Sequence, residues 1–155
     1  MYRYLFEEKC FSRVFGANRK INRDFIKKFR ETIARNLEIE DEDVKLNYYK
    51  NTKEELEIRL EATKEISKNF VFRVILNITE KGVSLISLDT YISRVVPIYI
   101  VGLRYVEDVI YNIMNEFSKS FFYQDLMARY KLKYEEISKK IYEDLETLFG
   151  FSPVS

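Results

Sequence analysis

The stretch from Phe70 to Ile92 constrains the fold more than any other part of the sequence. Two apolar, β-branched runs flank the segment TEKG, in which Gly82 can take the positive φ of a tight turn, so the pattern predicts a β-hairpin. Val71 and Ile75 add apolar groups to the second face of the first strand, which is therefore expected to be central. The residues on its first face are Phe70, Phe72, Val74, Leu76 and Ile78.

Two further strands are predicted before the hairpin. Residues 44–49 alternate in polarity, and residues 55–62 alternate apolar and charged side chains without a miss. The residue types of the second segment favour helix, but the period of two indicates a strand. Residues 2–16 are rich in aromatics and fit either a strand or a short helix. Residues 95–101 contain a proline, which indicates an edge strand or an extended connection.

Helical periodicity appears in three places. Asn22 is a suitable N-cap for a helix that ends near Leu37. Two more apolar stripes, at residues 103–121 and 130–148, are about half a turn out of phase. Either the chain breaks near residues 118–124, or the last stripe packs on something other than this sheet, such as another subunit. That last stripe, our candidate interface, consists of Tyr130, Tyr134, Ile137, Ile141, Leu145 and Leu148.

The chain of 155 residues is 46% hydrophobic, which is enough core for one ordinary domain. We therefore expect a single α+β domain over residues 1–155. It should have an N-terminal basic helix, an antiparallel meander of four to five strands, and C-terminal helices that cover one sheet face.

Several kinds of catalysis are excluded by composition. There is no histidine, so histidine-dependent nucleophiles, bases and zinc sites are ruled out. The single cysteine, Cys10, is expected to be a small core residue in a reducing compartment. Carboxylates remain as the only candidates, but their spacing matches no metal motif, so no catalytic residue, metal or cofactor is assigned. They are Glu55, Glu57, Glu61, Glu80 and Asp89.

Residues 19–35 carry seven basic residues and only two acidic ones. A basic helix can contact phosphates, which makes this segment a candidate nucleic-acid surface. Within it, Arg23 and Arg30 have no acidic residue four positions away, and the acidic run from Glu38 to Asp43 is expected to offset part of the charge. The candidate contacts are Arg19, Lys20, Arg23, Lys27 and Arg30.

The function expected from these patterns is binding rather than catalysis. A net charge of +1 argues against a general polyanion binder. We expect a small adaptor domain that self-associates, as a homodimer for example, or docks a protein partner. The alternative is a protein that binds nucleic acid or processes it with carboxylates and Mg²⁺. A third possibility is a small apolar ligand between sheet and helix.

The expected location is the cytoplasm. Glu7 and Glu8 stand where a secretory signal would be apolar, and the longest apolar run, residues 95–101, is too short to span a membrane. Abundant Glu and Lys lean toward a thermophilic source. Tyrosines such as Tyr48, Tyr49 and Tyr91 suit protein interfaces and base stacking alike, so they do not separate the alternatives.

Overall fold

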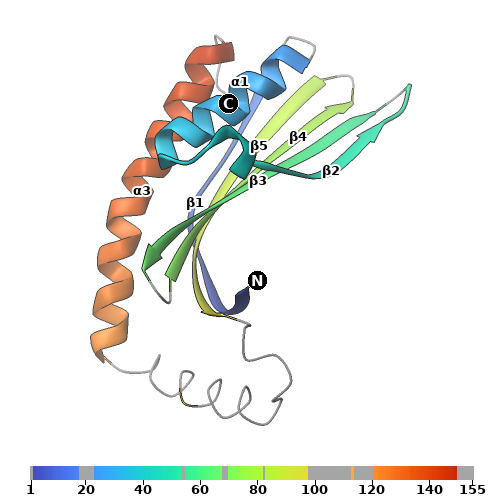
Figure 1. The fold of residues 1–155 in the computed structure, drawn as a ribbon. Helices are drawn as coiled ribbons and strands as arrows, with labels where there is room; N and C mark the ends of the chain where they lie inside the picture. Colours follow the sequence, from blue (N-terminus) through green and yellow to red (C-terminus); the bar gives the residue numbers. More distant parts are fainter. Residues whose placement is uncertain are drawn as a thin grey trace, which may run out of the picture.

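The computed structural model describes residues 2–17, 23–53, 55–67, 70–81, 83–97, 113 and 121–149. Strands and helices follow one another along the chain as shown in Figure 1. The elements are β1 (Tyr2–Ala17), α1 (Arg23–Leu37), the short 3₁₀ helix η1 (Asp41–Asp43), β2 (Lys45–Asn51), β3 (Leu56–Ser67), β4 (Phe70–Lys81), β5 (Val83–Pro97) and α3 (Phe121–Phe149).

The strands form one antiparallel five-stranded sheet in the order β1-β5-β4-β3-β2. Strands β2 to β5 are consecutive neighbours, which confirms the predicted meander. The predicted hairpin is also confirmed, because β4 pairs with β5 from Phe70 opposite Arg94 to Lys81 opposite Val83. Strand β4 is the middle strand of the sheet, as its two apolar faces indicated.

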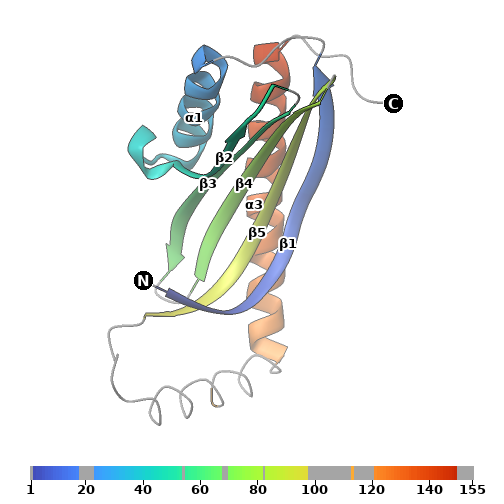
Figure 2. The same cartoon turned by 90° about the vertical axis from the view of Figure 1, so that its right-hand side faces the viewer.

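Both described helices lie on the same face of the sheet, as Figures 1 and 2 show together. Alternate residues of the strands point into the layer beneath α1 and α3. The ring of Phe72 on β4, for example, lies 4.6 Å from that of Tyr134 on α3. The largest fully buried side chains are Phe15, Phe29, Ile33, Leu37, Ile58, Leu60, Phe72, Leu76, Ile78, Ile86, Leu88 and Ile92. The opposite face is not covered by either described helix.

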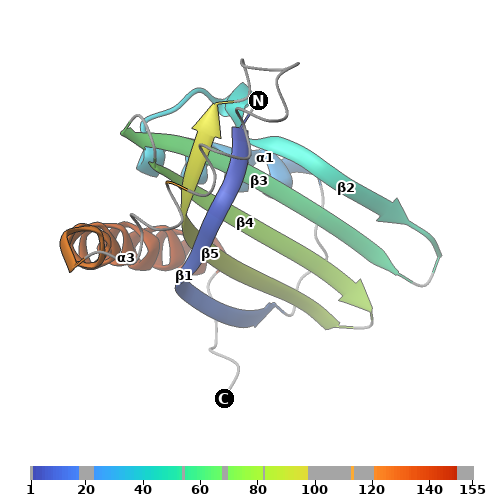
Figure 3. The same ribbon diagram turned by 90° about the horizontal axis from the view of Figure 1, so that it is seen from below.

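The first strand bends along its length, which Figure 3 shows where β1 crosses β5. Its pairing with β5 shifts register between Tyr4 and Phe6 and again between Lys9 and Phe11. Such bulges increase local twist and bend a strand. At the far end of β5, residues 95–97 extend past β4 and pair with β1 alone, a suitable place for Pro97.

Two parts of the expected architecture are wrong. The first element is a strand rather than the basic helix, because residues 2–17 pair with β5 and the helix follows as α1. The described C-terminal region holds one long helix of 29 residues, α3, instead of several. The first expected C-terminal helix falls on residues 103–121, most of which lie outside the described residues. The half-turn offset between the stripes at residues 103–121 and 130–148 therefore stays a prediction.

Candidate functional site

One of the basic residues of α1, Arg30, makes contacts within the fold. Arg23 and Lys27 are exposed, whereas Arg30 is half-buried. The guanidinium of Arg30 donates from Nε and Nη2 to the carbonyl of Val44, at 3.2 and 2.8 Å. It therefore anchors α1 to the chain entering β2. Arg19, Lys20 and the expected N-cap Asn22 lie outside the described residues.

A shallow depression of about 380 Å³ lies between α1 and η1. Three candidate nucleic-acid residues line it, and so do acidic residues from the run that was expected to offset them. The lining residues are Arg23, Ile26, Lys27, Arg30, Glu31, Asp41 and Glu42. Basic and acidic groups are thus equal in number, so the depression offers no net positive charge to a phosphate backbone.

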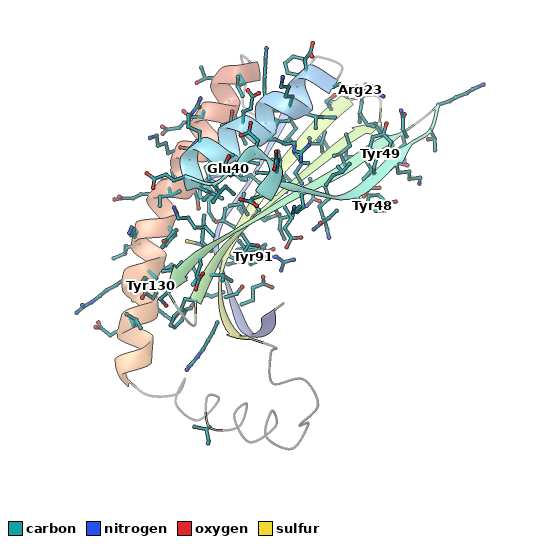
Figure 4. All side chains as sticks on the ribbon, viewed as in Figure 1. Arg23, Glu40, Tyr48, Tyr49, Tyr91 and Tyr130 are labelled. Atoms are coloured by element: carbon teal, nitrogen blue, oxygen red, sulfur yellow. The ribbon has the colours of Figure 1, made fainter. Side chains whose placement is uncertain are left out.

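Strand β2 is the edge of the sheet next to this depression. All seven of its residues are exposed, with Leu46, Tyr48 and Tyr49 at 50%, 46% and 56%. Leu46 and Tyr49 lie opposite two buried residues of β3, Leu60 and Ile58, so they face the helix side. Tyr48 lies on the open face; Figure 4 shows the two tyrosines on opposite sides of the strand.

The lysines of β2 both lie on the open face of the sheet. Lys45 is opposite Glu61 and Lys50 is opposite Glu57 in the pairing with β3. Five positions separate the two lysines, yet four separate their partners, because a bulge at Asn47 adds one residue to β2. We refer to the outer side of β2, with Lys45, Leu46, Tyr48, Tyr49 and Lys50, as the β2 edge surface.

Glu61, one of the candidate carboxylates, makes cross-strand contacts on the open face. Arg73 on β4 pairs with Glu61 on β3 and, at 2.7 Å, with Glu7 on β1, so one guanidinium ties β3 and β1 to β4. Burial lowers the pKa of Arg73, but hydrogen bonds and charge from Glu61 and Glu7 outweigh it and raise the pKa overall. Asn47 also donates to Glu61.

Asp89 has a separate set of partners on the same face. It accepts hydrogen bonds from Ser12 at 2.6 Å and Ser87 at 3.2 Å, and it lies 3.7 Å from the ammonium of Lys9. Across the described residues, no group of His, Cys, Asp or Glu is arranged to hold a metal ion. The contacts of Glu61 and Asp89 link neighbouring strands of the sheet.

The stripe on α3 that was our candidate interface is covered within the chain. Tyr134, Ile141 and Leu145 are buried in the core. The other three, Tyr130, Ile137 and Leu148, are partly buried against it. The periodicity correctly marked an apolar face, and in the structure that face packs on the sheet and on α1.

Cys10 belongs to the same layer, as expected. Its thiol is buried and donates to the carbonyl of Lys131 on α3 at 3.3 Å. Burial, reinforced by the charge of Glu135, raises the pKa of this thiol to about 11. The group is therefore neutral at ordinary pH and is a poor nucleophile.

No protein-family model matches this chain, and neither does any curated protein or solved structure. Among the described helices, none has the length and apolar character needed to cross a membrane. The described residues define an α+β fold in which helices cover one face of the sheet, neither described helix covers the other face, and the edge strand β2 is exposed.

The balanced charge around α1 leads to a prediction about nucleic acid. The wild-type protein is expected to show no measurable binding to single- or double-stranded DNA or RNA at roughly 0.15 M salt, because too few uncompensated cations are available to release counterions. Fluorescence anisotropy of labelled oligonucleotides over a salt series measures this. Tight binding that weakens steeply with salt and disappears in the variant Arg23→Glu with Lys27→Glu would restore the nucleic-acid alternative.

Proposed function

We propose that this chain is a non-enzymatic binding domain that docks a protein partner at the β2 edge surface. The observation that carries the proposal is the exposure of all seven residues of an edge strand that includes Leu46, Tyr48 and Tyr49. Tyrosine is enriched in protein interfaces because it combines a large apolar ring with a polar hydroxyl.

The surroundings of β2 support a protein partner over other ligands. On the helix side, Leu46 follows closely after Val44, whose carbonyl accepts the hydrogen bonds from Arg30 that hold this part of the chain to α1. The depression between α1 and η1, the element that precedes β2, carries groups of both charge signs, as the polar rims of protein interfaces do. The opposite edge strand, β1, carries two register shifts against the single one in β2, and each such bulge makes pairing with another chain less regular.

Site-specific photo-crosslinking in native cells tests the proposal. A photoreactive phenylalanine derivative replaces Tyr49 in one variant and Leu132 in the control. Leu132 is 69% exposed on α3, away from β2, and is therefore matched in accessibility. We expect a discrete protein adduct from position 49 and none from position 132, with the partner identified by mass spectrometry and its binding reproduced with purified components.

One further substitution sharpens the result. Replacing Leu46 with serine should reduce the adduct at position 49, because it removes an apolar contact from the same side of the strand. If the folded variant with the photoreactive residue at position 49 gives no more adduct than the control at position 132, a docking role for β2 is contradicted.

A further inference from the structure

Strand β3, the neighbour of β2 in the sheet, shows which side chains fit opposite those of β2. In the pairing with β3, glutamates lie opposite Lys45 and Lys50 on the open face, and apolar residues lie opposite Leu46 and Tyr49 on the helix side. Opposite charges and paired apolar groups across two strands are the contacts that stabilise a ladder. Strand β3 therefore supplies a template for a strand on the other side.

Within the described part of the chain, no strand pairs with the outer edge of β2. No described strand therefore uses the backbone groups along that edge. Both lysines are exposed, with Lys50 lying 3.8 Å from Glu55 across the turn, and β2 itself contains no acidic residue. A strand added there would meet two cationic side chains on the open face and two half-exposed apolar side chains on the helix side.

We propose that the β2 edge surface takes an extended segment of a partner protein by strand addition, with acidic residues opposite the two lysines and apolar residues opposite Leu46 and Tyr49. This inference rests on the proposed function and names the chemistry of its partner. The bulge at Asn47 sets the spacing: acidic residues belong four positions apart, as Glu57 and Glu61 are. The expected pattern is acidic, apolar, any residue, apolar, acidic.

A second copy of β2 fits this edge less well. Antiparallel pairing about Tyr49 keeps the faces aligned and places Lys50 opposite Tyr48 of the other copy, so the lysines gain no carboxylate. Lysines and a bulge on an edge are features that prevent uncontrolled pairing between copies. The same lysines favour an acidic strand, so the edge discriminates by charge.

A labelled peptide with blocked termini that copies residues 55–62 is the probe. Its match is the same peptide with lysine at the two positions corresponding to Glu57 and Glu61. Fluorescence anisotropy gives the affinities, and amide hydrogen exchange locates the site. We expect saturable binding of the acidic peptide, at least about tenfold weaker binding of the lysine peptide, and new protection confined to residues 45–51.

Variants of the protein test whether Lys45 and Lys50 cause the preference for an acidic peptide. Lys45→Gln with Lys50→Gln should remove the preference for the acidic peptide, whereas Lys140→Gln on the exposed side of α3 should leave it unchanged. Circular dichroism of each variant confirms that the fold is retained. If the lysine pair disturbs folding, hydrogen exchange on the wild type still decides the question.

The opposing outcomes are distinct. Equal binding of both peptides, protection outside β2, or no saturation at roughly millimolar peptide would overturn the strand-addition proposal. Sedimentation that shows a homodimer abolished by Tyr49→Lys would instead assign this edge to a second copy. A crosslinked partner at position 49 combined with no peptide binding would keep the docking function and reject strand addition as its mode.

Discussion

Replacing Ile141 with alanine is expected to lower the free energy of unfolding by about 2–5 kcal/mol. Ile141 lies on α3, is fully buried, and belongs to the single core between sheet and helices. Truncation removes apolar contacts and leaves a cavity that the surrounding strands can fill only in part. Urea denaturation followed by circular dichroism measures the change.

The matched control for this prediction is Leu132→Ala on the same helix. Leu132 is 69% exposed, so its truncation should change the free energy of unfolding by no more than about 0.5 kcal/mol. Small and equal effects of the two substitutions would mean that α3 is not docked on the sheet. The stripe would then be open to a partner, as the sequence first indicated.

Replacing Arg73 with methionine should cost about 1–3 kcal/mol of the free energy of unfolding, the second large effect. Methionine keeps most of the length of the side chain but leaves Glu7 and Glu61 without their shared cation. Glu61 is only 16% exposed, so water restores little of what its carboxylate loses.

A neighbouring arginine provides the comparison. Arg59 lies on the same open face but is exposed, and its Nε donates to the amide oxygen of Asn77 at 3.0 Å. Arg59→Met should therefore be close to neutral. If Arg73→Met matched it, the contacts from Arg73 to β1 and β3 would contribute nothing to stability. Adding Glu7→Gln and Glu61→Gln to Arg73→Met should recover part of the loss, since two unpaired charges are removed.

The meander could be predicted because local patterns and tertiary packing agree there. Residues 55–62 show this most clearly. Their many glutamates favour a helix, but the strict alternation predicted a strand with Ile58 and Leu60 on its buried face, and the structure has that strand. The helical periodicity that ends near Leu37 was likewise reliable, since Phe29, Ile33 and Leu37 are buried on one side of α1.

The first strand was undecided for a physical reason. The register shift between Lys9 and Phe11 makes Cys10 and Phe11 consecutive buried residues, so the period of two is broken in the middle of β1. The hydrogen-bond partner of Arg30 was missed for a related reason, because helix spacing reveals only partners three or four residues away. Its actual partner is a backbone carbonyl at Val44, which no side-chain pattern reports.

The ladder between β1 and β5 also shapes how the chain reaches this structure. Residues 2–17 are the first described strand to leave the ribosome, but Ala17 pairs with Ser84 and Tyr2 with Pro97. The N-terminal strand therefore cannot pair until β5, the last strand of the meander, has been synthesised. Contacts so distant in sequence slow folding, and until they form the edge of β5 is unpaired on the nascent chain. Pairing of β1 with β5, which completes the sheet, is thus expected to be a late step in folding.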